Sequence, residues 1–311
     1  MDAAVFHEPR RRLFAIDSRA GAGEMAALDF GPENRPFDVI FLHANGFNAL
    51  TYRSILGPLA AGVRVLAVDQ RGHGASRLEA RPEGRRSWKD FRDDLVALLE
   101  ALDQAPVVLS GHSMGGTVSV LAAAVRPERV ASLVLFDPVI MPPLVALYAR
   151  APWTSGRLWK QMPITQGALR RRAVFDSREA AFAAYKGRGA FKTWPDAVVA
   201  DYVAGGFVDT PDGKVMLACA PEWEASSFAA QGHDPWRALR RVKAPVRILK
   251  AEKGSTCRGS VGELKRRNPT LRIETVPGST HFLPMERPDL VRNALLDATL
   301  LPLGEGGARE P

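Results

Sequence analysis

The chain has 311 residues and a net charge of +8, and its 46% hydrophobic and 24% charged residues exclude a disordered, collagen-like or coiled-coil protein. Its length allows one large domain or two of roughly 100–200 residues, and no apolar run approaches the ~20 residues of a membrane-spanning helix. The chain has only two cysteines, Cys219 and Cys257, which excludes a disulfide framework. Because no apolar signal core is found either, we expect a cytoplasmic protein.

The first 137 residues alternate between short apolar runs and helical patterns. Two short antiparallel edge strands are expected at 13–16 and 25–28. Buried strands are expected at 38–42, 63–68, 107–110 and 130–136, with helices at 88–102 and 114–125 between them. Continuous apolar strands that alternate with helices predict a doubly wound, mostly parallel α/β sheet with right-handed crossovers.

This alternation stops after residue 137 and resumes near residue 245. The intervening segment carries helical patches and more than half of the aromatic residues of the chain. Strands at 245–249 and 271–276 then alternate with helices at 261–267 and 287–300. We therefore predict an α/β core formed by residues 1–137 and 236–303, an inserted, mainly helical cap at 138–235, and a disordered tail at 304–311.

A nucleophile-elbow pattern, G-x-S-x-G, lies between a predicted strand and a predicted helix. It reads Gly111-His112-Ser113-Met114-Gly115. A sharp strand-to-helix turn forces the serine into strained dihedrals and leaves no room for side chains two positions away, hence the glycines. The turn also directs the helix N-terminus toward the serine. A glycine-rich turn that merely contains a serine is the alternative interpretation.

The serine needs a base, and His281 is the histidine that the topology brings closest to it. His281 follows the last predicted strand, and the carboxyl ends of parallel strands meet at one edge of a sheet, where Ser113 also lies. His112 is expected to point away from the nucleophile, and His43 and His73 to order loops by hydrogen bonding.

Four motifs together resemble the α/β-hydrolase family with a cap inserted after the sixth strand. They are His43-Ala44-Asn45-Gly46-Phe47, Asp69-Gln70-Arg71-Gly72-His73-Gly74-Ala75-Ser76, Gly111-His112-Ser113-Met114-Gly115-Gly116 and Gly278-Ser279-Thr280-His281-Phe282. The resemblance implies an eight-stranded, mostly parallel sheet and a catalytic triad in the chain order nucleophile, acid, histidine.

The acid of this triad departs from the usual pattern of the family. Where members usually have it, in the loop after the seventh strand, this chain has Gly254. Some relatives instead have the acid at the end of the sixth strand, which here points to Asp137. Glu252 remains the alternative acid, and Asp137 could instead cap a turn before Pro138.

The resemblance also assigns the oxyanion hole to two backbone N–H groups. One belongs to Met114, directly after the nucleophile, and the other to Asn45, with the neighbouring Ala44 as an alternative. The Asn45 side-chain amide could supply a third donor.

The remaining motifs argue against other function classes. Short basic clusters are spread over the whole chain without a nucleic-acid-binding motif, so they are interpreted as solvated surface. We expect no cofactor and no metal, because the chain has neither a phosphate-binding motif nor metal-ligand spacing of His and Cys. Relatives that dehalogenate or open epoxides resemble this fold but have aspartate where Ser113 lies.

These features predict a serine hydrolase, a monomer or homodimer, that acts on an ester, thioester or lactone of a largely apolar small molecule. Tyr148, Trp153, Trp194 and Phe207 are candidates for lining its pocket, although cap aromatics equally suit the cap's own core. The alternatives are carbon–carbon bond hydrolysis, peptide hydrolysis or perhydrolysis on the same fold, and a non-enzymatic ligand receptor.

Overall fold

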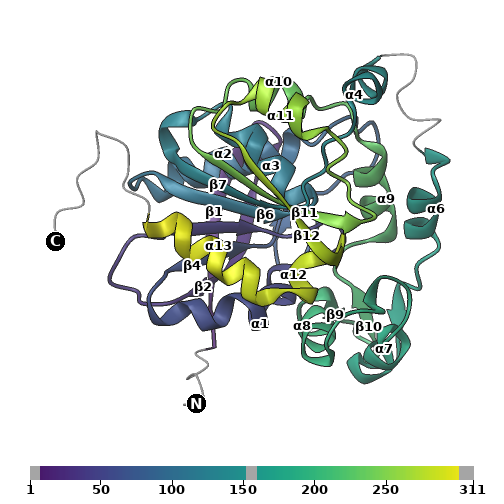
Figure 1. Cartoon of the computed structure of the whole chain (residues 1–311). Coiled ribbons are helices and arrows are strands. Elements are labelled where there is room, and N and C mark those ends of the chain that lie inside the picture. Colours follow the sequence, from purple (N-terminus) through teal and green to yellow (C-terminus); the bar gives the residue numbers. More distant parts are fainter. Residues whose placement is uncertain (1–7, 152–159, 301–311) are drawn as a thin grey trace.

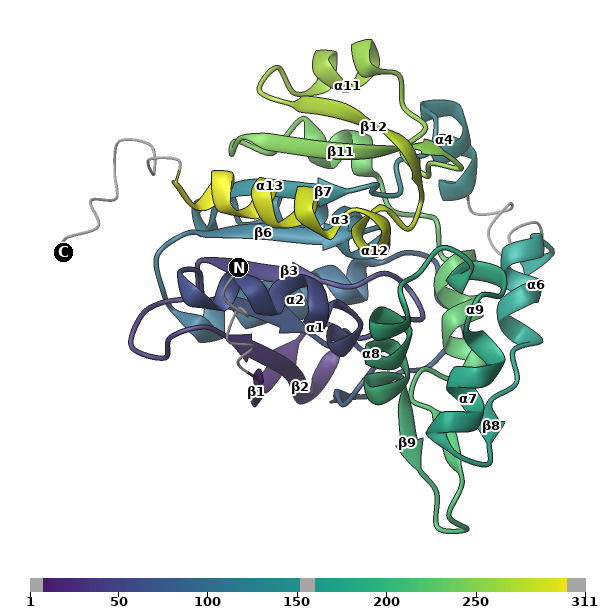
Figure 2. The ribbon, with the colours of Figure 1, turned by 60° about the horizontal axis from the view of Figure 1, so that its bottom comes forward.

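The computed structural model describes residues 8–151 and 160–300. At its centre lies a sheet with strand order β1-β2-β4-β3-β6-β7-β11-β12, and β5 pairs with β2 (Figures 1 and 2). The strands are β1 Arg10–Ser18, β2 Gly21–Phe30, β3 Val39–Leu42, β4 Val65–Val68, β5 Arg77–Leu78, β6 Val107–His112, β7 Val130–Phe136, β11 Val246–Lys253 and β12 Arg272–Thr280. The predicted α/β-hydrolase fold is confirmed, and the short β5 adds a ninth strand to the eight expected.

The burial of the strands matches their direction. The adjacent strands β4, β3, β6, β7, β11 and β12 run parallel to one another, whereas β2 is antiparallel to both β1 and β4. Every residue of β3, β4 and β6 is buried. Such runs are typical of parallel strands that helices cover on both faces.

Helices cover both faces of this sheet. They are α1 Arg53–Leu56, α2 Lys89–Leu102, α3 Met114–Ala123, α10 Pro235–Leu239, α11 Val261–Arg267, α12 Leu283–Glu286 and α13 Pro288–Leu300. On one face Leu98 of α2, Val118 of α3 and Leu264 of α11 belong to one apolar core. On the other face Ile55 of α1 and Val291 of α13 belong to a second core.

The insertion between β7 and α10 lies beside one end of the sheet (Figure 2). It contains α4 Pro143–Arg150, α6 Pro163–Leu169, β8 Val174–Phe175, α7 Arg178–Tyr185, α8 Asp196–Gly206, β9 Phe207–Asp209, β10 Val215–Leu217 and α9 Pro221–Ala229. Its strands form a small antiparallel sheet in the order β8-β10-β9, which the expectation of a mainly helical cap did not include. The predicted tail at 304–311 lies outside the described residues.

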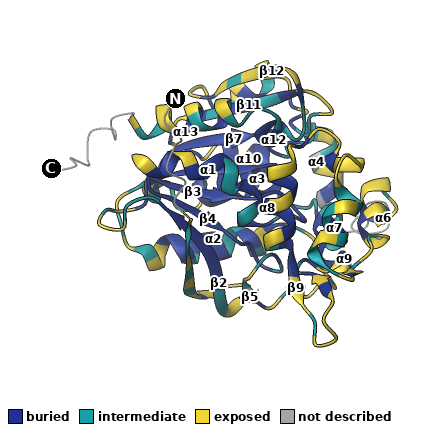
Figure 3. Ribbon diagram, turned by 90° about the horizontal axis from the view of Figure 1, so that it is seen from below, coloured by how far each residue is buried: buried dark blue, intermediate teal, exposed yellow. Residues whose placement is uncertain are grey.

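The insertion contacts the core through more than one helix, and α8 and α9 are among them. α8 packs against the turn at Ala49–Tyr52 that follows β3, while α6 packs against α9 within the insertion. Buried residues dominate the central sheet, whereas α6 carries mainly exposed and intermediate ones (Figure 3). Across the described ranges, no helix combines the length and apolar character needed to span a bilayer.

Two glycines allow α3 to lie unusually close to the sheet. A Cβ at Gly115 would lie 2.3 Å from the carbonyl oxygen of Leu42, at the end of β3. A Cβ at Gly111 would lie 2.5 Å from the carbonyl carbon of Gly115. Both obstacles are backbone atoms, which cannot rotate away, so the approach of α3 to β3 and β6 requires glycine at these positions.

We expect Gly115→Ala to destabilise the protein, because the added methyl group would push α3 away from β3. The free energy of unfolding should fall by about 1–3 kcal/mol, the usual cost of overpacking. Chemical denaturation measures this change, with Gly262→Ala as the control, since nothing lies within 4 Å of a Cβ at that helical glycine. Equal stability of the two variants would contradict the packing described here.

Candidate active site

Ser113 occupies the sharp turn between β6 and α3. Its backbone has φ 55° and ψ −115°, a conformation that side chains rarely adopt and that only a well-packed surrounding maintains. The side chain is buried, with the residue 7% exposed. Because α3 begins at Met114, the N-terminus of the helix faces the serine, as the elbow pattern predicted.

Three side chains that are far apart in the sequence lie in one hydrogen-bonded line. His281 Nε2 is 3.0 Å from Ser113 Oγ, and His281 Nδ1 is 2.6 Å from Asp137 Oδ2. His281 follows the end of β12, and Asp137 follows β7. The sheet topology therefore brings together at one edge the three residues that sequence analysis selected.

Asp137 is fully buried, and its carboxylate is held by several donors. Oδ1 accepts from the N–H of Ala251 at 3.0 Å and from Ser255 Oγ at 2.6 Å, and Oδ2 accepts from the N–H of Thr256 at 2.9 Å. Burial alone would raise the pKa of Asp137, but the hydrogen bond and charge of His281, with the bonds from Ser255 and Thr256, hold it below the usual value. The carboxylate therefore stays ionised beside the imidazole.

Glu252, the alternative acid, lies elsewhere. It is exposed, and its Oε2 accepts a hydrogen bond from the N–H of Gly278 at 3.0 Å. Of the two candidate carboxylates, the one that contacts His281 is Asp137.

Sequence analysis missed the contribution of Ser255 and Thr256. They lie in the loop after β11, where members of the family that the sequence resembles usually have the acid, and they supply hydrogen bonds to the Asp137 carboxylate. Thr256 Oγ1 also lies 3.4 Å from His281 Nδ1. The signal that could have revealed them is a pair of hydroxyl residues directly after Gly254, in a loop at the carboxyl edge of the sheet.

The two backbone N–H groups that the sequence assigned to an oxyanion hole belong to Met114 and Asn45. Met114 is the first residue of α3, so its N–H has no partner within the helix. The Asn45 N–H bonds to no acceptor among the described residues, whereas the N–H of Ala44 donates to Tyr52 Oη at 3.2 Å. The geometry therefore favours Asn45 over Ala44 as the second donor.

The Asn45 side-chain amide, which we considered as a third donor, has one of its two N–H groups bonded to the cap. Its Nδ2 donates to the carbonyl oxygen of Glu224 on α9, at 3.0 Å. This bond joins the cap to the loop after β3 and fixes that loop, while the second N–H of the amide is left for another acceptor.

Two buried histidines fix the same loop from the side of the core. His43 Nδ1 donates to the carbonyl of Ala44 at 2.7 Å, and His43 Nε2 accepts from the N–H of Gln70 at 3.0 Å. His73 Nε2 accepts from the N–H of Gly46 at 3.1 Å. Burial lowers the pKa of His43 to about 4 and that of His73 well below its usual value, so both rings remain neutral acceptors.

The four candidate pocket residues lie in different environments. Trp194 is buried and packs edge-on against Phe47 at 5.2 Å and Phe282 at 5.7 Å between ring centroids, and the ring of Phe282 in turn lies 5.7 Å from that of His281. Phe207 packs against Phe175 within the cap. Tyr148 is half-exposed on α4, and Trp153 lies outside the described residues.

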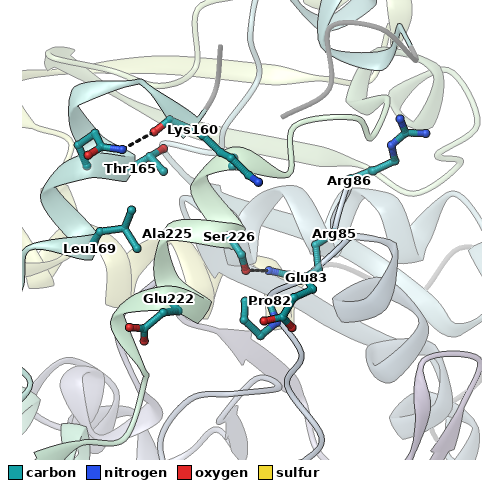
Figure 4. Close-up of a pocket in the computed structure, with 13 residues that line it drawn as sticks. Pro82, Glu83, Arg85, Arg86, Lys160, Thr165, Leu169, Glu222, Ala225 and Ser226 are labelled. Carbon is teal, nitrogen blue, oxygen red and sulfur yellow. Dashed lines mark hydrogen bonds between the residues drawn. The ribbon is translucent and has the colours of Figure 1, made fainter. Parts of the chain in front are cut away.

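One cavity of about 480 Å³ lies away from this site, between α6, α9 and the loop at 82–86 (Figure 4). Arg85, Lys160, Thr165 and Ser226 are among its lining residues, and Arg85 Nη1 bonds to Ser226 Oγ at 2.9 Å. The described residues that line it include none of the three residues of the hydrogen-bonded line. Over the described ranges, no group of His, Cys, Asp and Glu side chains has the arrangement of a metal site.

Known proteins share this arrangement of elements. A family model described as "Alpha/beta hydrolase family" matches residues 39–294. The 2-(acetamidomethylene)succinate hydrolase of Mesorhizobium japonicum is 28% identical over 83% of this chain and 86% of its own length. A crystal structure of E-2-(acetamidomethylene)succinate hydrolase superposes with a TM-score of 0.73 at 24% identity, covering 92% of this chain and 98% of that one.

The fold is also shared with more distant proteins. A thioesterase domain from the curacin biosynthetic pathway superposes with a TM-score of 0.73 at 16% identity, covering 94% of this chain and 100% of that one. At this identity the likeness concerns the fold alone. The family match, which spans most of the chain, carries the assignment: this protein belongs to the α/β-hydrolase family.

Proposed function

We propose that this protein is a serine hydrolase that cleaves a carboxylic ester, thioester or lactone of a small, largely apolar molecule through an acyl-enzyme intermediate. The observation that carries the proposal is the continuous line from Ser113 Oγ through His281 to Asp137, with contacts of 3.0 and 2.6 Å. A serine hydroxyl is a weak nucleophile, and a base at hydrogen-bond distance is what activates it.

In the first half of the reaction Ser113 Oγ attacks the substrate carbonyl while His281 Nε2 accepts the hydroxyl proton. Negative charge develops on the carbonyl oxygen, and the N–H groups of Met114 and Asn45 bind it. The protonated His281 then donates its proton to the leaving group, and the acyl group stays on Ser113.

The second half releases the acyl group. Water takes the place of the leaving group, His281 accepts its proton, and the resulting hydroxide attacks the acyl-enzyme. Collapse of the second tetrahedral intermediate returns the proton to Ser113 Oγ and frees the acid. Asp137 keeps the proton of His281 on Nδ1, so that Nε2 faces Ser113, and it stabilises the ring when it is charged.

The preference for an apolar substrate rests on the residues around His281. Phe282 follows it directly, and the rings of Phe47 and Trp194 pack on Phe282. Hydrocarbon or aromatic groups of a substrate are more stable in contact with such side chains than in water. A small-molecule substrate suits a serine that is 7% exposed beneath a cap.

Amide hydrolysis is a second candidate, and one comparison favours it. The name of the relative from Mesorhizobium japonicum gives a substrate with an acetamido group, and that relative matches 83% of this chain. The same nucleophile, base and oxyanion hole act on an N-acyl group, provided that His281 protonates the leaving nitrogen.

A fluorophosphonate probe tests the nucleophile. We expect the native protein to be labelled covalently, because an activated serine attacks phosphorus as it attacks a carbonyl. Ser113→Ala should abolish labelling, and intact-mass and peptide analysis locate the adduct. An unlabelled native protein, or an adduct at another serine, would refute the proposal.

The acid is tested by comparing two carboxylate-to-amide variants. Asp137→Asn should lower kcat by about 10³–10⁴-fold, since an amide at this position holds the wrong tautomer of His281. Glu252→Gln should lower it much less, because Glu252 bonds to the N–H of Gly278 and not to the imidazole. Steady-state kinetics on a chromogenic ester measures both, and the reverse ranking would overturn the assignment of Asp137.

A substrate panel separates the two candidate reactions. We expect p-nitrophenyl esters with apolar acyl chains to be hydrolysed with a higher kcat/KM than N-acyl amides of the same acyl group, because p-nitrophenoxide is a good leaving group even without a proton, whereas an amide nitrogen leaves only after protonation. The panel measures kcat/KM for matched ester and amide pairs, with Ser113→Ala as the blank. Faster cleavage of the amides would favour the second candidate.

A further inference from the structure

Two fully buried side chains that the proposed reaction does not use join two loops of the site. One is the oxyanion loop, residues 43–48 after β3, which carries the Asn45 N–H, and the other is the segment after β12 that begins with His281. Tyr52 lies in the turn after β3, and His112 is the last residue of β6. Tyr52 Oη is 2.8 Å from His112 Nδ1, and His112 Nε2 is 2.8 Å from the carbonyl oxygen of His281. At the other end the N–H of Ala44 donates to Tyr52 Oη at 3.2 Å.

The direction of every hydrogen bond in this network is fixed. A carbonyl oxygen only accepts, so the proton of His112 is on Nε2. Burial lowers the pKa of His112 to about 3, which keeps the ring neutral and leaves Nδ1 without a proton. Nδ1 therefore accepts from the Tyr52 hydroxyl, and burial keeps the pKa of that hydroxyl well above its usual value, so that it retains the proton it donates.

The network contacts each part of the proposed machinery through the backbone. Ala44 precedes Asn45, whose N–H is the second oxyanion donor. His112 precedes Ser113, and its ring lies 5.0 Å from that of His281 between centroids. The imidazole of His281 is held at Nδ1 by Asp137, but its backbone carbonyl is held by His112.

We propose that Tyr52 and His112 are positioning residues, which fix the oxyanion loop and the backbone of His281 relative to Ser113. Without the Tyr52 hydroxyl, the N–H of Ala44 and Nδ1 of His112 both lose their buried partner. Buried polar groups seldom remain unpaired, so the His43–Ala44 peptide would move to find another acceptor and would displace the next peptide, which carries the N–H of Asn45. Neither residue touches the reacting atoms.

The inference rests on the proposed function for its kinetic test. Tyr52→Phe removes one oxygen and keeps the ring that packs against Phe41. We expect kcat and the rate of fluorophosphonate labelling to fall by about 5- to 50-fold, with KM within about twofold of native. The displaced Asn45 N–H would bind the oxyanion of the transition state less well, whereas the substrate in its ground state carries no such charge. His112→Asn should behave similarly.

Ser18→Ala is the control. It also removes a hydroxyl that donates a hydrogen bond to a buried group, Asp94 Oδ1 at 2.6 Å, but Ser18 lies at the end of the edge strand β1 and has no bond to this network. We expect native rates from this variant. Thermal unfolding of all variants, with kinetics measured well below the midpoint, separates a loss of folded protein from a loss of rate. Should His112→Asn fail to fold, Tyr52→Phe carries the test alone.

Native rates in Tyr52→Phe would overturn the inference, as would an effect on KM alone. If the native protein is not labelled at all, the proposed function fails while the positioning network is still tested by NMR. The ¹⁵N shifts of the His112 ring should show the neutral tautomer with the proton on Nε2 at neutral pH. A charged ring, or a proton on Nδ1, would contradict the network whatever the activity.

Discussion

The contact between Asp137 and His281 is the interaction on which the arrangement of this site depends. A carboxylate with no exposed surface is costly to bury unless donors surround it, and here the donors come from three different parts of the chain. The N–H of Ala251 belongs to β11, that of Thr256 to the loop after it, and the imidazole to the segment after β12. One buried charge thereby holds together the carboxyl ends of three neighbouring strands.

The loop that carries the Asn45 N–H is held from two sides. On the core side, His43, His73 and Tyr52 bond to its backbone. On the cap side, Asn45 Nδ2 donates to the carbonyl of Glu224, and Tyr202 Oη donates to the carbonyl of Gly46 at 3.2 Å. Donors that are fixed before the reaction need no reorganisation when charge develops, which is the main electrostatic advantage of an oxyanion hole. The cap therefore supports the proposed oxyanion hole without supplying a donor.

Sequence reasoning succeeded where a local rule fixes the geometry. A tight turn at Ser113 requires the glycines around it, and the ends of parallel strands share an edge of the sheet. Ser113, His281 and Asp137 could therefore be selected together.

Sequence reasoning failed where hydrogen-bond partners are distant in the sequence and their residue types are common. Nothing near Tyr52 in the sequence indicates a bond to His112, and a Ser-Thr pair such as Ser255-Thr256 occurs in many loops. The small sheet of the cap was missed because its strands have only two or three residues, too few for an alternating pattern.

The aromatic residues of the insertion form a series of ring contacts that reaches the residue after His281. Ring contacts of 4.7–5.5 Å between centroids link Phe175 to Phe207, Tyr185 to Phe191 and Phe191 to Trp194. Trp194 then contacts Phe282, the neighbour of His281. A close-packed interior transmits small displacements from one side chain to the next. The aromatic core of the cap is therefore continuous with the ring that follows His281.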